Sequence, residues 1–176
     1  MTAPLRWFAL ALLTSALFLG VSNRAQAADV SVGGFGTYLD PKDYDESWGG
    51  GLRLKYDLVE YIAFDLRASM VRVRPFDANM FPLEANLLLQ VPLGKTLLPY
   101  GGMGVGYYLF DSGDPQLQHE LGYGPLAGLE LRLGRSVAIF GEARWLFLEP
   151  DVKGSSTLSK ALLDSFGVNA GIMFLF

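Results

Sequence analysis

The sequence contains no cysteine and only one histidine, His119, among its 176 residues. The lack of cysteine excludes a disulfide framework, a cysteine-ligated zinc site and a thiol nucleophile. A lone histidine likewise excludes a histidine-rich metal centre. Basic residues are scarce as well, because 14 Lys and Arg are outnumbered by 18 Asp and Glu, and the basic stripe of a nucleic-acid-binding protein is missing. We therefore expect no metal, no cofactor and no nucleic-acid partner.

A long hydrophobic run occurs only at the amino terminus. Residues 7–21 are apolar, but this run is shorter than the roughly 20 residues that cross a bilayer. Arg6 precedes the run, and the small-residue sequence Ala25-Gln26-Ala27 follows it. A charged start, an apolar centre and a small-residue cleavage site are typical of a secretory signal peptide rather than of a membrane anchor. The sequence therefore predicts a signal peptide over residues 1–27 and an exported domain over residues 28–176.

The exported domain lacks helical periodicity and instead alternates polar with apolar residues. Glycine is abundant at 21 residues, and aromatic residues make up 13% of the chain. Period-2 alternation, repeated eight times between turn residues, predicts an all-β chain of antiparallel strands. We expect the strands at residues 29–39, 47–57, 61–73, 82–92, 98–110, 121–133, 137–148 and 165–176.

The connections between these segments alternate between short and long. Short turns are expected at residues 58–60, 94–96 and 134–136, and longer links at residues 40–46, 74–81, 111–120 and 149–164. This layout is typical of an up-and-down transmembrane barrel of the outer membrane, whose tilted strands cross the hydrocarbon with about 9–11 residues each. Because the number of strands is even, both termini would lie on the short-turn, periplasmic side.

Alternation alone does not show which face points outward, because a soluble lipocalin-like barrel alternates as well. Glycine favours the membrane barrel, since it gathers on the polar face, where small residues suit the crowded interior of an eight-stranded barrel. These glycines are Gly49, Gly51, Gly102, Gly104, Gly106, Gly122, Gly124, Gly128, Gly167 and Gly171. Aromatic residues near strand ends on the apolar face match the interfacial girdles of membrane barrels. They are Tyr38, Trp48, Tyr56, Tyr123, Trp145, Phe147 and Phe176.

With the polar face inward, nine charged side chains share the lumen, five positive and four negative. They are Arg53, Lys55, Asp65, Arg67, Glu84, Glu130, Arg132, Glu142 and Arg144. Buried charges are tolerated when they are paired and hydrogen-bonded, so we interpret this near-balance as an interlocked structural network. Catalytic carboxylates would need a cleft wide enough for substrate, and a water-filled channel would need around 16 strands. The sequence therefore predicts a charge-plugged lumen without catalytic residues.

The carboxyl-terminal strand is apolar at every second position and ends in phenylalanine. The residues concerned are Val168, Ala170, Ile172, Phe174 and Phe176. This spacing resembles the outer-membrane β-signal that the barrel-assembly machinery recognises. Together with Phe140-x-Glu142-x-Arg144 and the eight-strand layout, it makes residues 28–176 similar to the small outer-membrane β-barrel family that includes OmpX and the OmpA membrane domain. The resemblance implies a monomeric eight-stranded barrel in the cell outer membrane, but no particular function, because functions in this family reside mostly in loops.

The longer links carry most of the net charge. Eleven Asp and Glu residues are accompanied there only by Lys42, Arg74, Lys153 and Lys160, so we expect acidic extracellular loops. Such loops suit divalent cations or a partner, or they form a solvated rim. Arg72 would lie on the lipid-facing side close to Arg74, where both suit lipopolysaccharide phosphates. A local bulge would instead turn Arg72 inward.

Three functions from different classes fit these patterns. The first, which we expect, is a non-enzymatic barrel with a structural or surface-interaction role, in contact with outer-membrane lipid and lipopolysaccharide. The second is a conduit for small hydrophobic solutes, similar to OmpW, which a gap lined by Phe35, Tyr100 or Phe110 would favour. The third is a lipid-modifying barrel enzyme, whose chemistry would use a serine activated by a base. No His-x-Ser pattern accompanies His119.

Overall fold

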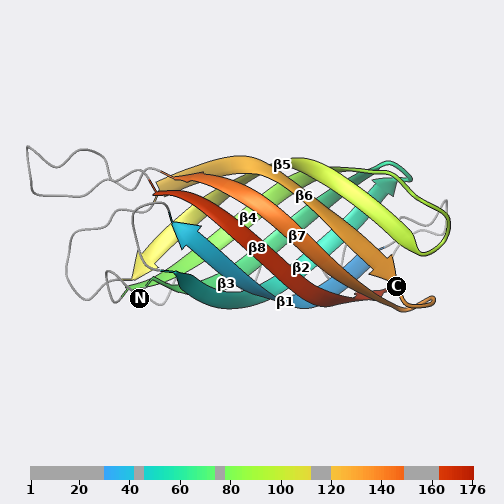
Figure 1. The fold of residues 1–176 in the computed structure, drawn as a ribbon, viewed down its shortest axis with the longest axis horizontal. Coiled ribbons are helices and arrows are strands. Elements are labelled where there is room, and N and C mark those ends of the chain that lie inside the picture. Colours follow the sequence, from blue (N-terminus) through green and yellow to red (C-terminus); the bar gives the residue numbers. More distant parts are fainter. Residues whose placement is uncertain (1–29, 42–45, 74–77, 112–119, 149–162) are drawn as a thin grey trace, which may run out of the picture.

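The computed structural model describes residues 30–41, 46–73, 78–111, 120–148 and 163–176, which form eight β-strands (Figure 1). The strands are β1 (Val30–Pro41), β2 (Ser47–Val59), β3 (Ile62–Val73), β4 (Ala78–Gln90), β5 (Leu97–Asp111), β6 (Glu120–Arg132), β7 (Val137–Leu148) and β8 (Leu163–Leu175). Each strand pairs antiparallel with its neighbours in chain order, and β8 pairs with β1, so the sheet closes into a barrel. This confirms the predicted all-β, up-and-down, eight-stranded architecture. The predicted signal peptide lies outside the described residues.

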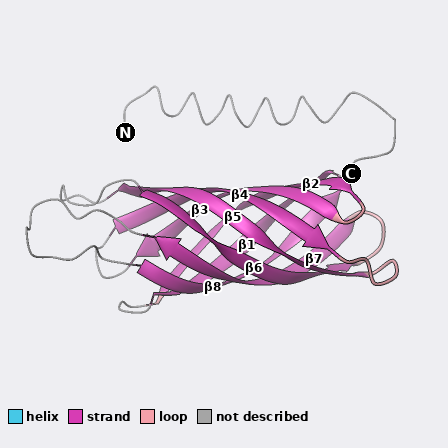
Figure 2. Cartoon of the chain, turned by 90° about the horizontal axis from the view of Figure 1, so that it is seen from above, coloured by secondary structure: helices cyan, strands magenta, loops and turns pink. Residues whose placement is uncertain are grey.

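A second view shows the same closed wall of strands (Figure 2). Within the described ranges, no helix is long and apolar enough to cross a membrane.

The two ends of the barrel differ in their connections. We call the end that holds the β2–β3, β4–β5 and β6–β7 turns and the carboxyl terminus the turn end (Figure 1). There the Phe176 amide donates to the Val30 carbonyl oxygen at 2.9 Å, so β1 begins where β8 ends. At the opposite end, the loop end, the strands lead into residues 42–45, 74–77, 112–119 and 149–162, which lie outside the described residues. The first and last strands therefore share the turn end, as predicted.

Two of the short turns depend on glycine. Gly94 has φ +73° between β4 and β5, and Gly134 has φ +107° between β6 and β7. Residues with a Cβ rarely adopt these left-handed angles, so glycine permits both reversals. The glycine positions explain why the sequence predicts turns at residues 94–96 and 134–136.

The predicted strand boundaries agree with the structure within two residues except at the start of β4. The sequence predicts a link over residues 74–81, but β4 begins at Ala78. Asn79 in this extension lies opposite Arg72 of β3. Asn79 and Pro82 obscure the alternation here, because both residue types are depleted in strands. The predicted longer link therefore narrows to residues 74–77.

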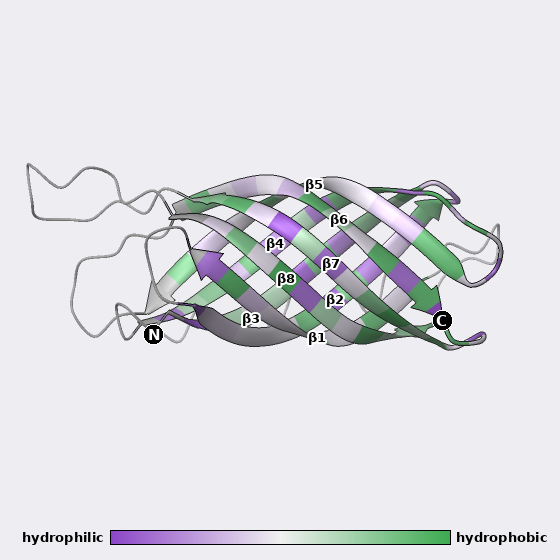
Figure 3. Cartoon of the chain, in the orientation of Figure 1, coloured by the Kyte–Doolittle hydropathy of each residue, from purple (hydrophilic) through white to green (hydrophobic). Residues whose placement is uncertain are grey.

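Hydrophilic and hydrophobic residues alternate along the strands (Figure 3), and in β2 buried positions alternate with more exposed ones from Arg53 to Leu58. In β2, Arg53 and Lys55 are buried, whereas the neighbouring Leu52 is 59% exposed. Large exposed apolar side chains occur on every strand, which gives the barrel an apolar outer surface. The apolar face therefore points outward, as predicted, and a lipocalin-like barrel with an apolar interior is excluded.

The ten glycines predicted on the polar face do lie toward the lumen. A Cβ atom added at any of them would come within 3.0 Å of a neighbouring strand or a lumen side chain. At Gly124 the Cβ would lie 1.7 Å from the Trp145 carbonyl oxygen, whereas at the outward Gly141 it would meet nothing within 4 Å. Inward glycines therefore let the strands curve tightly around a filled interior.

Candidate functional site in the barrel lumen

The structure brings all nine charged residues singled out in the sequence into the lumen. Seven of them are buried, while Arg132 and Arg144 are partly exposed. Asp57 of β2 is a tenth member, which the sequence-based set did not include. These ten side chains come from β2, β3, β4, β6 and β7, and they form three groups along the barrel axis.

The turn-end layer consists of Lys55, Asp57, Glu130 and Arg132. Lys55 Nζ donates to Glu130 Oε2 at 2.8 Å and lies 3.2 Å from Asp57 Oδ1. Arg132 Nε donates to Glu130 Oε1 at 3.1 Å, and its Nη2 lies 3.5 Å from Asp57 Oδ2. Gln90 Nε2 adds a hydrogen bond of 3.0 Å to Asp57 Oδ1. Each carboxylate thus has two cationic partners, and the layer carries no net charge.

The middle layer consists of Arg53, Asp65, Arg67 and Glu142. Arg67 reaches across the lumen, where its Nη1 and Nη2 donate to the two oxygens of Glu142 at 2.5 and 2.7 Å. The same guanidinium donates to Asp65 Oδ2 through Nε at 2.9 Å. Asn169 Nδ2 and the Tyr100 hydroxyl each donate to Glu142 at 3.1 Å. A bidentate arginine–carboxylate pair of this kind fixes orientation as well as charge.

Arg53 completes the middle layer through a different set of contacts. Its Nη2 lies 3.2 Å from Asp65 Oδ2, and its Nη1 donates to the Tyr100 hydroxyl at 3.3 Å. The guanidinium carbon also lies 4.3 Å from the centre of the Phe140 ring. A desolvated cation over an aromatic face is stabilised by the ring quadrupole. Both arginines of the layer are therefore matched by the carboxylates of Asp65 and Glu142, so this layer is neutral too.

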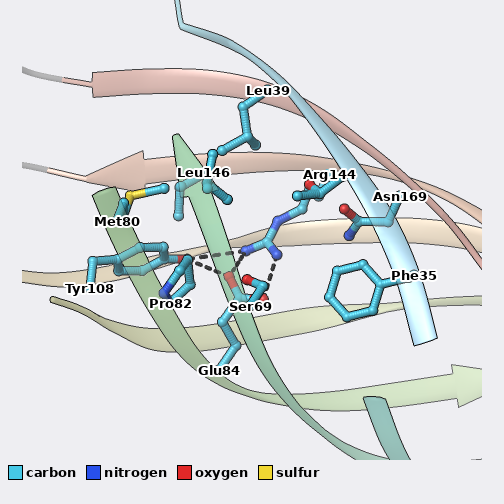
Figure 4. A pocket seen from close by; sticks show the side chains of 12 residues that line it. Phe35, Leu39, Ser69, Met80, Pro82, Glu84, Tyr108, Arg144, Leu146 and Asn169 are labelled. Atoms are coloured by element: carbon cyan, nitrogen blue, oxygen red, sulfur yellow. Dashed lines mark hydrogen bonds and ion pairs between the residues drawn. The ribbon is translucent and has the colours of Figure 1, made fainter. Parts of the chain in front are cut away.

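The loop-end layer is the pair Glu84 and Arg144 with the hydroxyl of Tyr108 (Figure 4). Arg144 Nη1 donates to Glu84 Oε2 at 2.6 Å, and its Nη2 donates to Glu84 Oε1. Tyr108 donates to Glu84 Oε1 at 2.6 Å and accepts from Arg144 Nη2 at 3.1 Å. One cation and one anion make this third layer neutral as well.

Neutrality within each layer has a physical reason. An unpaired ion in a low-dielectric interior costs several kcal/mol, whereas a paired and hydrogen-bonded ion is tolerated. A surplus charge in one layer would lack a partner of its own, since the described charges of the other layers are already paired. Among the side chains that the structure describes, the lumen therefore holds five cations and five anions that balance locally.

Several polar partners were not evident from the sequence as members of the site. They are Asp57, Gln90, Tyr100, Tyr108 and Asn169. The sequence signal for these residues was their position in the alternation of inward and outward residues along a strand. Tyr100 and Tyr108 share the face of the inward glycines of β5, and Asn169 lies between the inward Gly167 and Gly171 of β8. This alternation shows that a residue points inward, but it does not identify the charged group that the residue contacts.

A small cavity lies beside the loop-end layer (Figure 4). Its volume is about 10 Å³, roughly the minimum that one water molecule needs. Phe35 lines it together with Arg144 and Asn169. Tyr100 instead belongs to the middle layer, and the side chain of Phe110 is outside the described part of the chain. Of the two expected gap residues whose side chains are described, Phe35 lines this cavity and Tyr100 does not.

The remaining predicted positions lie on the outer surface. Arg72 is exposed and lies opposite Trp48, without the bulge that would turn it inward. Arg74 is outside the described residues. Outward aromatic pairs of described residues lie at the loop end, with distances between ring centres of 4.7 Å for Tyr38 and Trp48, 5.0 Å for Trp145 and Phe166, and 5.6 Å for Tyr123 and Phe147. The predicted assembly-signal residues also point outward: Val168, Ala170, Ile172, Phe174 and Phe176.

No metal-binding group is present in the described part of the chain, since no three of its His, Asp or Glu side chains cluster appropriately. His119 lies outside that part.

A closed eight-stranded barrel with an apolar exterior and a charged, filled interior defines the class of small outer-membrane β-barrels. No family model matches the sequence, and no curated protein matches it significantly. Solved structures are similar across nearly the whole barrel. Neisserial surface protein A has a TM-score of 0.63 at 13% identity, covering 84% of this chain and 96% of that protein.

Two further structures show the same likeness. OprG from Pseudomonas aeruginosa has a TM-score of 0.60 at 21% identity, with 85% and 96% of the chains covered. Outer membrane protein W of E. coli has a TM-score of 0.57 at 15% identity, with 87% and 100% covered. At these identities the likeness establishes the fold, which is the eight-stranded barrel fold predicted for small outer-membrane proteins.

Proposed function

We propose that this chain is a non-enzymatic outer-membrane barrel whose lumen is closed to solutes and whose role is structural or surface-interacting. The observation that carries the proposal is the lumen, where ten charged side chains form three neutral layers. Ion pairs that fill the interior of an eight-stranded barrel leave no aqueous path through it. Interaction would then take place at the loop end, where the exposed carboxylates of Asp40 and Glu46 contribute to an acidic rim.

The experiment that tests this proposal combines a gel assay with electrical recording. The mature chain, refolded in detergent, should migrate faster on SDS gels before boiling than after, because a closed barrel resists SDS. Reconstituted into a planar lipid bilayer, it should produce no stable conductance steps, whereas a large porin run in parallel should. Stable single-channel steps would refute the closed lumen. A soluble chain without a gel shift would refute the membrane barrel itself.

Lipopolysaccharide is the lipid partner that we propose for the outer surface. Arg72 points outward beside Trp48 at the loop end, the level of the outer-leaflet headgroups in this orientation. Arginine binds phosphate oxygens with paired hydrogen bonds. Replacing Arg72 and Arg74 with alanine should lower the lipopolysaccharide that copurifies with the barrel, and replacing the turn-end Arg135 should not. Equal copurification in all variants would remove this assignment.

The barrel-assembly machinery is the partner that we propose for biogenesis. Phe176 is 80% exposed at the end of β8, and the apolar residues of its signal share the outer face. The variant Phe176→Ser should therefore reduce the amount of barrel in the outer membrane, while Phe166→Ser, outside the terminal positions, should reduce it less. Equal amounts of the wild type and of Phe176→Ser in the outer membrane would show that the assembly machinery does not recognise the terminal aromatic residue.

A conduit for small hydrophobic solutes is the second candidate, and two interruptions in strand pairing favour it. The β3–β4 ladder passes from Ala68 opposite Leu83 directly to Val71 opposite Met80. Pro82 falls in this interval, and proline has no N–H to donate to the ladder. The β6–β7 ladder is interrupted in the same way around Pro125.

The first interruption adjoins the cavity of Figure 4, because Ser69 and Pro82 line it. A lateral path would connect this cavity with the lipid through the β3–β4 wall. Pro82→Val restores the missing donor and should reduce uptake of an apolar fluorescent dye by cells that carry the barrel. Pro99→Val is the matched control, since Pro99 is already paired with Leu129. No dye uptake above that of cells without the protein would reject the conduit.

A further inference from the structure

A ring of apolar side chains and glycines surrounds the lumen at the loop end. We call it the apolar collar and define it by one residue from each strand: Leu39, Gly49, Val71, Met80, Tyr108, Gly122, Leu146 and Gly167. Register places several of them directly opposite one another, as in Leu39 with Gly167 and Val71 with both Gly49 and Met80. The charged side chains of the ionic layers lie on the turn-end side of this ring, and Tyr108 belongs to both because its hydroxyl bonds Glu84 and Arg144.

The large side chains of the collar occupy the space beside its glycines. Leu39 Cδ2 would lie 2.7 Å from a Cβ built on Gly167, and Val71 Cγ2 would lie 2.8 Å from one built on Gly49. Tyr108 Cε2 would likewise lie 2.6 Å from a Cβ built on Gly122. A large residue on one strand thus occupies the space that the glycine of another leaves open, and the ring closes.

Burial shows how tightly the collar closes. Leu39 is 6% exposed, Met80 and Leu146 are 3% exposed, and Val71 is 1% exposed, although all lie within two residues of a strand end. A cavity of about 10 Å³ lies between described residues of the collar and the residues beneath it (Figure 4). A hydrated ion needs far more room than this, and an apolar constriction gives it no partner to replace its water.

The turn end of the lumen is closed by groups of another kind. The Arg132 side chain is 28% exposed and that of Asp57 is 11% exposed, and together they form an ion pair of 3.5 Å. Arg132 at this end is more exposed than Arg144 of the loop-end layer, whose side chain is 12% exposed, and the large aliphatic side chains of the collar above Arg144 are almost fully buried. The lumen is therefore asymmetric along its axis.

We infer that the apolar collar separates the ion-pair network from external water, so that polar solutes of the medium are excluded at the loop end before they reach the ion pairs. This inference rests on the proposed function, because it takes the loop end to face the medium. It goes further by assigning the outer permeability barrier to Leu39, Val71, Met80 and Leu146 rather than to the ion pairs. The solutes that the collar would exclude from the lumen are the water-soluble ions of the medium.

Cysteine labelling tests the inference cleanly, since the chain has no cysteine of its own. Thr37→Cys places a thiol under the collar, at a residue that lines the cavity and is 6% exposed. Glu46→Cys places one at the exposed rim of the loop end. A small cationic methanethiosulfonate reagent added to intact cells should label the Glu46→Cys variant quickly. It should label the Thr37→Cys variant at least about tenfold more slowly, because a cation must shed water to pass the collar.

Opening the collar should abolish this difference. Leu146→Ala combined with Thr37→Cys should raise the labelling rate about tenfold or more, since it removes apolar atoms from the ring. Met80→Ala serves as a second opening should Leu146→Ala fail the heat-modifiability check. Phe147→Ala is the matched control, because Phe147 is the neighbouring side chain on the lipid-facing side and its loss should leave the rate unchanged.

Two results would overturn the collar while leaving the membrane barrel in place. One is equal labelling of Thr37→Cys and Glu46→Cys in an otherwise unaltered, heat-modifiable barrel. The other is a labelling rate of Thr37→Cys that neither collar variant changes. Failure to label Glu46→Cys on intact cells, with labelling restored in broken cells, would instead refute the proposed orientation, and the collar assignment would fall with it.

Discussion

Arg67 of β3 and Glu142 of β7 face each other across the lumen and share two hydrogen bonds of 2.5 and 2.7 Å. They are 75 residues apart in the sequence, and each is buried. This pair joins opposite walls of the barrel at the middle of the ionic column. If either residue of this pair is replaced, the other is left as a buried charge that has lost its partner.

Removing one partner of this pair should destabilise the barrel strongly. Glu142→Gln leaves Arg67 with a single carboxylate, and the penalty for breaking a buried pair is about 3–5 kcal/mol. Arg67→Met with Glu142→Leu removes both charges and should cost much less than the sum of the single variants. Urea unfolding of the refolded barrel, followed by the heat-modifiable band, measures Glu142→Gln, the single variants Arg67→Met and Glu142→Leu, and the double variant. Additive losses in the double variant would contradict the coupling.

Asp57→Asn should be milder than Glu142→Gln, although both variants add one positive charge to a layer. The side chains of Asp57 and its partner Arg132 are 11% and 28% exposed, so water screens the surplus charge at the turn end. We expect a loss of about 1–2 kcal/mol, the range of a hydrogen bond between charged groups that water in part replaces. The same unfolding assay checks it. A loss equal to that of Glu142→Gln would show that the turn-end layer is as dry as the middle layer.

Gly124→Ala should impair folding, because the added Cβ would lie 1.7 Å from the Trp145 carbonyl oxygen. The strands would have to separate locally, and such overpacking typically costs about 1–3 kcal/mol. Gly141→Ala is the matched control, since nothing lies within 4 Å of its Cβ. The yield of the fast-migrating band after refolding measures the effect. Equal yields for the two variants would contradict the close approach of β6 and β7.

Trp48 and Trp145 should report on lipid contact. Both are outward, with 60% and 54% of their surface exposed, and Trp7 lies in the predicted signal peptide. In bilayers made with brominated lipids, tryptophan fluorescence of the mature barrel should be quenched, because bromine quenches on contact. Lipids brominated near the headgroup should quench more strongly than those brominated near the chain end, since interfacial aromatics lie at that depth. Fluorescence that brominated lipids do not change would place the apolar face elsewhere.

Alternation made the wall of the barrel predictable. A strand with period 2 places all its odd or all its even residues on one side, so the inward set of β7, with Phe140, Glu142 and Arg144, followed from the sequence. Turn glycines such as Gly134 then marked where strands reverse. Only the start of β4 was placed wrongly, where Asn79 and Pro82 blur the pattern.

Pairing inside the lumen was not predictable in the same way. Which carboxylate meets Arg67 depends on the strand tilt and on the diameter of the closed barrel, and neither is encoded in the alternation of one strand. Asp57 shows the consequence, because its position near the end of β2 gave no sign that Lys55 and Arg132 converge on it. Tyr100 and Tyr108 were likewise invisible as partners, since a tyrosine hydroxyl carries no charge to balance.

The inward glycines also determine the cross-section of the barrel. Those that would drive a Cβ into the carbonyl oxygen of a neighbouring strand lie along four seams, β8–β1, β2–β3, β4–β5 and β6–β7, as at Gly33, Gly51, Gly102 and Gly124. These seams divide the wall into four panels of two strands each: β1–β2, β3–β4, β5–β6 and β7–β8. Arg67–Glu142 and Arg144–Glu84 join the β3–β4 panel to the β7–β8 panel. Lys55–Glu130 and Arg132–Asp57 join the other two panels. Each set of ion pairs thus holds one pair of opposite panels together. If the barrel is flattened in one direction, one set resists the change, and if it is flattened in the other direction, the second set does.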